Sequence, residues 1–241
     1  MTNHLNQKYK DKVESCISAL KEFETSRIDF EKKYKNTFFE NSDINKLTTF
    51  LNLLNFKKVE HETVSYLNIK CDDLKHFKDG RTNLEYAIDL MLGWLIEDGV
   101  SFYLIKNNVP ASLNGADSNR EFLKRFQIRA DADLSVKSDD LVNLEVFCDW
   151  SNTWEKYNHA DFRDQKFLKL KNTNALILGI SPKISKGFLI DVNKQSNIFK
   201  YCQSIKGYGG KSGYSIYNIR EHLLPLNEIQ TKLNSTFQRF I

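Results

Sequence analysis

Carboxylates are concentrated in residues 128–150, a segment whose other residues are typical of β-strands. From 126 to 136 apolar and polar residues alternate, and the same alternation returns from 142 to 149. Residues alternate between the two faces of a strand, so each run places its acids on one side. Residues 137–140 have the composition of a turn. We therefore expect an antiparallel hairpin with these acids on one face: Asp131, Asp133, Glu145 and Asp149.

Carboxylates that converge on one face repel one another, and a divalent cation relieves that repulsion. Mg²⁺ takes one or two protein carboxylates together with waters and a substrate phosphate. It can polarise a phosphodiester and lower the pKa of a water, while a nearby lysine stabilises developing charge. The competing interpretation is a solvated acidic sheet face. The strongly apolar flanks of both strands favour a metal site, whereas Asp149 is more typical of a strand-end cap or a solvated group.

The elements expected around this hairpin alternate between helix and strand. An amphipathic helix is predicted over 81–99, with Glu85 beside its apolar stripe and Gly99 at its end, followed by a strand over 100–106. After the hairpin we expect a helix over 159–172, strands over 175–181 and 187–192, and a terminal helix from 220. This order predicts an α/β fold with a mixed central β-sheet flanked by helices.

At this point the chain resembles the PD-(D/E)XK nuclease core, whose stand-alone members of this size are commonly type II restriction endonucleases. A helix with Glu85, a strand, and a hairpin with an Asp on one strand and a Glu on the next carry the resemblance, which spans about residues 81–181. It implies that Asp133, or alternatively Asp131, is the motif aspartate. It further implies that Glu145 is the motif glutamate and that Glu85 assists catalysis.

Two positions depart from the family pattern. No proline precedes Asp133, and Phe147 stands where the motif lysine is expected. Some members of the family recruit a basic residue from the following helix. Lys166 is the candidate substitute here, and a solvated helix lysine is the alternative. The predicted 159–172 helix would align Lys166 in one stripe with His159, Arg163 and Lys169. His159 could act as a general base or have no role.

Basic and aromatic residues suited to DNA lie mainly in loops. The glycine-rich run 206–215 lacks the Walker A spacing and runs into a strand pattern, so it is either a mobile hairpin or loop, or a loop that approaches phosphates closely. The segment 112–125 has Asn, Ser and Arg side chains suited to base edges, and also the composition of any loop. The candidate DNA-binding residues are Arg120, Arg129, Arg163, Lys206, Lys211 and Tyr208.

Composition sets wider limits. The chain has 241 residues, 41% of them hydrophobic, and a formal net charge of +4, which is only weak support for a polyanionic partner. The four cysteines form no CxxC pair, so we expect reduced thiols and no zinc site. Polar residues fill the first thirty positions and no apolar run reaches membrane length. A cytoplasmic protein with no membrane partner is expected.

Together these features predict a Mg²⁺-dependent endodeoxyribonuclease that cleaves double-stranded DNA at a specific sequence. A helical region over 1–80 would support dimerisation or clasp DNA, and 81–241 would form the nuclease core, within one compact unit. The resemblance further implies a homodimer and a cognate DNA methyltransferase as genetic partner. Two alternatives stay open: a catalytically inactive nucleic-acid-binding protein with a nuclease-like core, and a nuclease of repair or phage defence.

Overall fold

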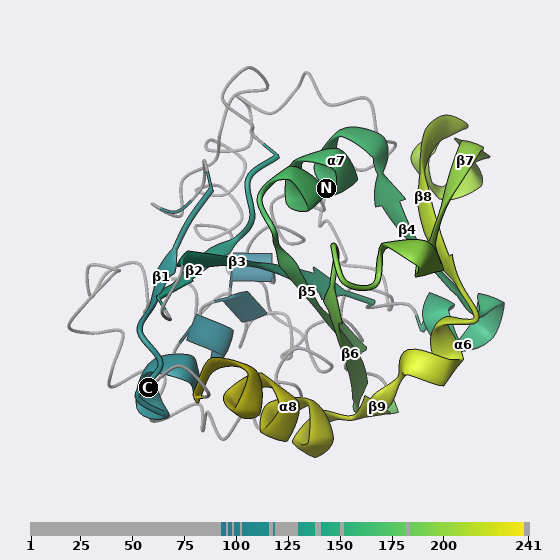
Figure 1. The fold of residues 1–241 in the computed structure, drawn as a ribbon. Helices are drawn as coiled ribbons and strands as arrows, with labels where there is room; N and C mark the ends of the chain where they lie inside the picture. Colours follow the sequence, from purple (N-terminus) through teal and green to yellow (C-terminus); the bar gives the residue numbers. More distant parts are fainter. Residues whose placement is uncertain are drawn as a thin grey trace, which may run out of the picture. The chain divides into compact units, whose positions relative to one another are not determined.

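The computed structural model describes residues 93–94, 96–97, 99–101, 103–115, 118, 130–137, 141–149, 152–181 and 184–238. Nearly all of them belong to one of the two compact units into which the chain divides, made of Val100–Gly115 and Arg129–Ile241. This unit is mixed α/β, as predicted, with a mixed sheet and a few helices (Figure 1). The expected helices before residue 81 lie outside the described residues.

A six-stranded sheet runs in the order β1-β2-β3-β5-β6-β9. Strands β3 and β5 are parallel and every other neighbouring pair is antiparallel. The sheet is therefore mixed, in agreement with the sequence-based expectation. Its strands are β1 Ala111–Leu113, β2 Leu134–Lys137, β3 Leu141–Cys148, β5 Leu176–Ser181, β6 Lys186–Asp191 and β9 Leu224–Pro225.

A second, three-stranded antiparallel sheet runs in the order β4-β8-β7. It consists of β4 His159–Arg163, β7 Phe199–Ile205 and β8 Lys211–Tyr217. Single-turn helices border its strands, namely η4 Ser196–Ile198, η5 Lys206–Tyr208 and η6 Ile219–His222.

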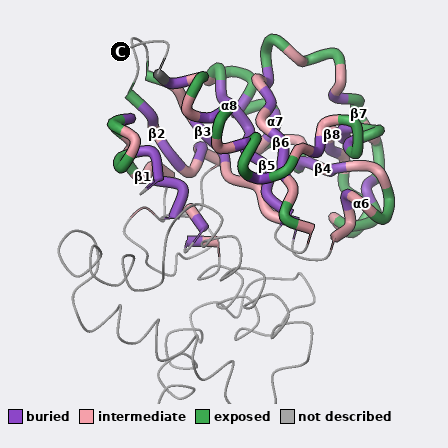
Figure 2. The backbone as a smooth tube through the Cα atoms, turned by 90° about the horizontal axis from the view of Figure 1, so that it is seen from below, coloured by how far each residue is buried: buried purple, intermediate pink, exposed green. Residues whose placement is uncertain are grey.

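Two longer helices pack on the strands. Figure 1 shows α7 (Asp164–Asn172) above and α8 (Leu226–Gln238) below β5 and β6. In α8 the buried residues recur every three or four positions, which gives the helix one apolar face: Leu226, Ile229, Leu233 and Phe237. Every residue of β5 is buried, as expected for a central strand covered on both faces. The buried stretches follow β2, β5 and β6 in Figure 2, and exposed stretches gather around β7.

The predicted strand over 100–106 is wrong. The described residues from 93 to 106 are helical, and Ile96, Val100 and Leu104 are buried at a helical spacing of four. Gly99 lies inside this helix instead of closing it. The helix ends at Lys106, and the positive φ of 62° at Asn108 together with Pro110 just beyond it is typical of a helix C-terminus.

The predicted helix over 159–172 is wrong for its first five residues and confirmed for the rest. Its first five residues form β4, and α7 begins only at Asp164. Within β4, Ala160 and Phe162 are buried while the residues between them are not, which is the two-residue period of a strand. A short helix that sequence reasoning did not predict, α6 (Thr153–Tyr157), precedes it. The C-terminal helix starts at Leu226 and not at residue 220.

Candidate active site

The hairpin of β2 and β3 brings Asp133 beside Glu145. Leu134 pairs with Leu144 in the antiparallel ladder, so Asp133, immediately before β2, lies opposite Glu145. The backbone N–H of Val146 donates a hydrogen bond of 2.8 Å to Asp133 Oδ2. The predicted juxtaposition is therefore present, although Asp131 and Asp133 precede the strand instead of lying within it.

Lys166 reaches both carboxylates from α7. Its Nζ lies 2.6 Å from Glu145 Oε2 and 3.9 Å from Asp133 Oδ1. The same ammonium donates a 2.6 Å hydrogen bond to the backbone carbonyl of Asp131. The Glu145 side chain is only 11% exposed, so its charge lies in surroundings where an ion pair is weakly screened. The ammonium of Lys166 thus lies close to groups of all three predicted acids, Asp131, Asp133 and Glu145.

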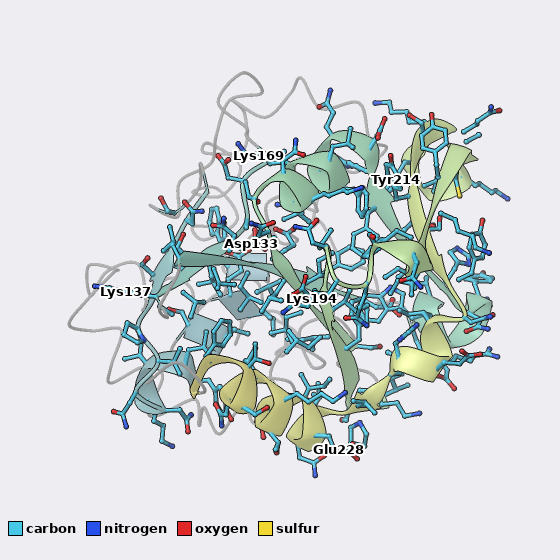
Figure 3. The ribbon with its side chains drawn as sticks, viewed as in Figure 1. Asp133, Lys137, Lys169, Lys194, Tyr214 and Glu228 are labelled. Carbon is cyan, nitrogen blue, oxygen red and sulfur yellow. The ribbon has the colours of Figure 1, made fainter. Side chains whose placement is uncertain are left out.

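Lys169, one turn further along α7, binds the remaining acid. Its Nζ lies 3.1 Å from Asp131 Oδ1, and its side chain is 48% exposed. Figure 3 labels Lys169 on α7 and Asp133 below it. In this cluster three carboxylates face two ammonium groups. The carboxylates therefore retain an excess of negative charge that a further cation could balance.

The donor chemistry of this cluster fits Mg²⁺. Carboxylate oxygens are the ligands that Mg²⁺ prefers, and one or two of them suffice when water and phosphate complete the shell. Asp133 and Glu145 already share a single cation, the ammonium of Lys166. In the part of the chain that the structure describes, no group of three or more His, Cys, Asp or Glu side chains is arranged to hold a metal. Asp133 and Glu145 are the two carboxylates that lie around the ammonium of Lys166.

Phe147 is partly buried and packs against the hydrophobic core. Its ring centroid lies 4.8 Å from that of Phe162 and 5.4 Å from that of Trp154. Phe147 pairs with Gly179 in β5, and Gly179 pairs with Phe188 in β6. A Cβ on Gly179 would meet the Phe188 ring at 2.2 Å, so the glycine makes room for that ring. A lysine at position 147 would have to place its ammonium among these aromatic side chains.

Asp149 is buried and caps the first turn of α6. Its Oδ1 accepts hydrogen bonds of 2.9 Å from both the backbone N–H and the hydroxyl of Thr153, and its Oδ2 accepts one of 2.8 Å from the N–H of Trp154. Free N–H groups at a helix start are satisfied by such carboxylates. This matches the strand-end cap favoured from the sequence.

The predicted basic stripe is wrong, because two of its members lie in a strand. His159 is in β4, where its Nε2 lies 3.3 Å from Asp161 Oδ2. Arg163 ends the same strand, with its guanidinium carbon 5.5 Å from the centroid of the Tyr208 ring. Only Lys166 and Lys169 share α7. The signal that could have separated the two elements was the alternation of "HADFR" before Asp164.

Three of the other predicted DNA-binding residues lie in the glycine-rich segment between β7 and β8 or at its end. Tyr208 and Lys206 lie in η5, and Lys211 begins β8. The Tyr208 hydroxyl donates a 2.6 Å hydrogen bond to the carbonyl of Asp161, and its burial, together with the Asp161 carboxylate, raises its pKa to about 12. Tyr208 is thus a structural anchor of the glycine-rich loop, whereas Lys206 and Lys211 are exposed. The remaining candidates lie outside the described residues: Glu85, Arg120 and Arg129.

Comparison of the chain with protein families, curated proteins and solved structures yields no match. Among the helices that the structure describes, none has the length and apolar character needed to cross a membrane. Neither of the two described cysteines, Cys148 and Cys202, is in a disulfide bond. The function must therefore be argued from the geometry of the acid–lysine cluster.

Proposed function

We propose that this protein is a Mg²⁺-dependent endodeoxyribonuclease with a PD-(D/E)XK-like core, acting on double-stranded DNA as a type II restriction enzyme. The observation that carries the proposal is the position of Lys166. Its ammonium lies 2.6 Å from Glu145 and 3.9 Å from Asp133, although the residue comes from α7 and not from β3. Two carboxylates and a lysine at such distances are the groups that metal-assisted phosphodiester hydrolysis requires.

The arrangement of elements supports the same proposal. The β2–β3 hairpin carries the acids, α7 crosses next to it, and β5 returns parallel to β3. A parallel return through a helix places that helix over the strand that carries Glu145. The side-chain amide of Asn143 in β3 donates a 3.3 Å hydrogen bond to the carbonyl of Thr173 at the end of α7, which fixes the helix over the strand.

In this mechanism Asp133 and Glu145 would hold Mg²⁺, with Asp131 near the site. When bound, Mg²⁺ supplies Lewis-acid stabilisation of charge on the scissile phosphate. Lys166 would leave its ion pair with Glu145 far enough to orient the attacking water and to stabilise the phosphate oxygens through its N–H groups. The Val146 N–H keeps the Asp133 carboxylate oriented throughout.

Several further assignments belong to the proposal. Glu85 would assist the carboxylates, and the protein would act as a homodimer with a DNA methyltransferase as genetic partner. Exposed basic groups near the three-stranded sheet would contact phosphates of the duplex. They are Arg163, Lys206 and Lys211.

The proposal is tested by incubating the purified full chain with long duplex DNA, first with Mg²⁺ and then with EDTA. Discrete fragments that require Mg²⁺ support a restriction enzyme, and a smear favours a nuclease of repair or phage defence. DNA binding without cleavage at any Mg²⁺ concentration would refute the catalytic assignment and leave a nucleic-acid-binding protein.

Substitutions test the individual roles. Asp133→Ala and Glu145→Ala should each abolish cleavage and retain DNA binding. Lys166→Ala should lower the rate by about 10²-fold or more, the usual effect of losing one charge-stabilising group. Lys169→Ala is the matched control, because it removes a lysine from the same helix and near the same acids. Equal cleavage rates for Lys166→Ala and the unsubstituted protein would exclude Lys166 as the motif lysine.

A further inference from the structure

An aromatic row lies on the three-stranded sheet and the end of α6, outside the acid–lysine cluster. The ring of His159 in β4 lies 6.1 Å from that of Tyr157 and 6.4 Å from that of Tyr217, measured between centroids. His159 and Tyr217 are cross-strand partners in β4 and β8. The two tyrosines are 55% and 48% exposed. Large aromatic rings so open to solvent, and so close together, need an explanation.

Cations accompany this row at both ends. Lys156 Nζ lies 5.0 Å from the centroid of the Tyr157 ring, and Lys200 Nζ lies 5.6 Å from that of Tyr217. Both lysines are exposed. A cation over an exposed ring is a weak interaction, so each ammonium can leave its ring at little cost and bind another anion.

The carboxylate nearest to the row is already engaged. Asp161 accepts a 2.6 Å hydrogen bond from Ser215 Oγ and lies 3.3 Å from His159 Nε2. Its side chain is less exposed than that of His159. The charges that lie directly over the outer rings are the ammonium groups of Lys156 and Lys200, which suits a polyanion.

The row faces away from the acid–lysine cluster. Phe167 of α7 stacks at 4.0 Å on Tyr214, the β8 residue that alternates with Ser215 and so points to the opposite face. Cys202 Sγ lies 3.3 Å from the Tyr217 hydroxyl and 3.4 Å from Ser215 Oγ, which places β7 side chains on the same face as the row. The aromatic row is thus a surface separate from the candidate active site.

We propose that the row Tyr157–His159–Tyr217, with Lys156 and Lys200, binds single-stranded nucleic acid. Unpaired bases stack on exposed aromatic rings, and lysines beside the rings bind the phosphates between them. Bases within a duplex are already stacked on one another and cannot cover the rings in this way. The proposal does not depend on the nuclease assignment, because it concerns other residues and needs no metal.

The test is fluorescence anisotropy of labelled oligothymidylate and oligouridylate, with the oligothymidylate–oligoadenylate duplex as competitor, all in EDTA. Tyr157→Ala/Tyr217→Ala should weaken single-strand binding by roughly ten-fold for each ring lost. Tyr217→Phe, which keeps the ring, should bind as the unsubstituted protein does. Replacing Lys156 and Lys200 by Ala should make the slope of log binding constant against log salt concentration shallower by about 0.7 per lost phosphate contact.

Tyr201→Ala is the matched control. Tyr201 is 56% exposed and belongs to the same sheet, but its ring packs edge-on against Tyr214 on the other face. Its replacement should leave binding unchanged, with circular dichroism confirming that all variants fold. Three results would overturn the proposal: no binding of either oligonucleotide, equal binding by the double variant, or preference for the duplex. Preference for one of the two oligonucleotides would identify DNA or RNA as the partner.

Discussion

Substitution of Lys166 tests the acid–lysine cluster most directly. Its effect is measured as a change in the free energy of unfolding, and no enzyme assay is needed. Lys166→Met keeps most of the aliphatic stem and removes the charge that binds Glu145 and Asp133. Two carboxylates that are 11% and 19% exposed would then lose their shared cation. We expect a clear loss of stability in the absence of metal, and the reverse of that loss when a divalent cation is added.

The magnitude follows from the burial of the groups involved. Removing one partner of a buried ion pair costs about 3–5 kcal/mol because the other charge stays unpaired. Lys166 is 25% exposed, and Asp133 keeps its bond from the Val146 N–H. Water and this hydrogen bond offset part of the cost, which lowers the expected value to about 2–3 kcal/mol. Lys169→Met, the exposed control, should cost less than about 1 kcal/mol.

The assay is urea denaturation followed by tryptophan fluorescence, to which the buried Trp154 contributes. It is run in EDTA and again with Ca²⁺, which takes the same oxygen ligands. A ligand at 100 times its Kd stabilises the folded state by about 2.7 kcal/mol. Lys166→Met should gain more from Ca²⁺ than the unsubstituted protein, because no ammonium then competes for the carboxylates.

Two results would refute this reasoning. If Lys166→Met and Lys169→Met shift the urea midpoint equally, Lys166 does not stabilise the carboxylates of Asp133 and Glu145 in the folded state. If Ca²⁺ stabilises the unsubstituted protein and Lys166→Met by the same amount, the cation binds elsewhere, and the proposed magnesium site between Asp133 and Glu145 is wrong.

Two further predictions concern packing and pH. Gly179→Ala places a Cβ 2.2 Å from the Phe188 ring and should cost about 1–3 kcal/mol by thermal denaturation; Gly207→Ala, whose Cβ would meet nothing within 4 Å, is the control. Because Tyr208 stays protonated in the folded state up to a pKa of about 12, against 10.0 as its ordinary value, its contribution to stability is complete below pH 10 and falls as the pH rises to 12. Tyr208→Phe should reduce that loss in urea midpoints measured across this pH range, and an unchanged pH profile would contradict the assignment.

The hairpin could be predicted from the sequence because its signal is local. Alternation over 142–148 defines β3, and antiparallel pairing then forces Asp133 opposite Glu145. Lys166 lies near the predicted acids, but not because of the helical stripe expected from the sequence. The expected stripe does not exist, yet Lys166 lies in α7 and points to Glu145.

What could not be predicted depends on tertiary contacts. The segment 100–106 is rich in residues that suit strands, but helical burial of Val100 and Leu104 outweighs that propensity. In β4 the alternation is only five residues long and runs directly into α7. The three-stranded sheet joins β4 to β7 and β8, which follow it by many residues, and no local pattern reveals such pairing.

The packing of Phe147 against the core limits which residues can replace it. A single change to lysine at this position would put a charge between Trp154 and Phe162, while Lys166 still held Glu145. Such a variant would lose the ring packing of Phe147 and leave an ammonium among aromatic side chains. A lysine at this position of β3 therefore requires compensating substitutions among the neighbouring aromatic residues, whose effects are not additive. In this fold the lysine beside Glu145 comes from α7, and position 147 of β3 is occupied by a ring that packs on Phe162.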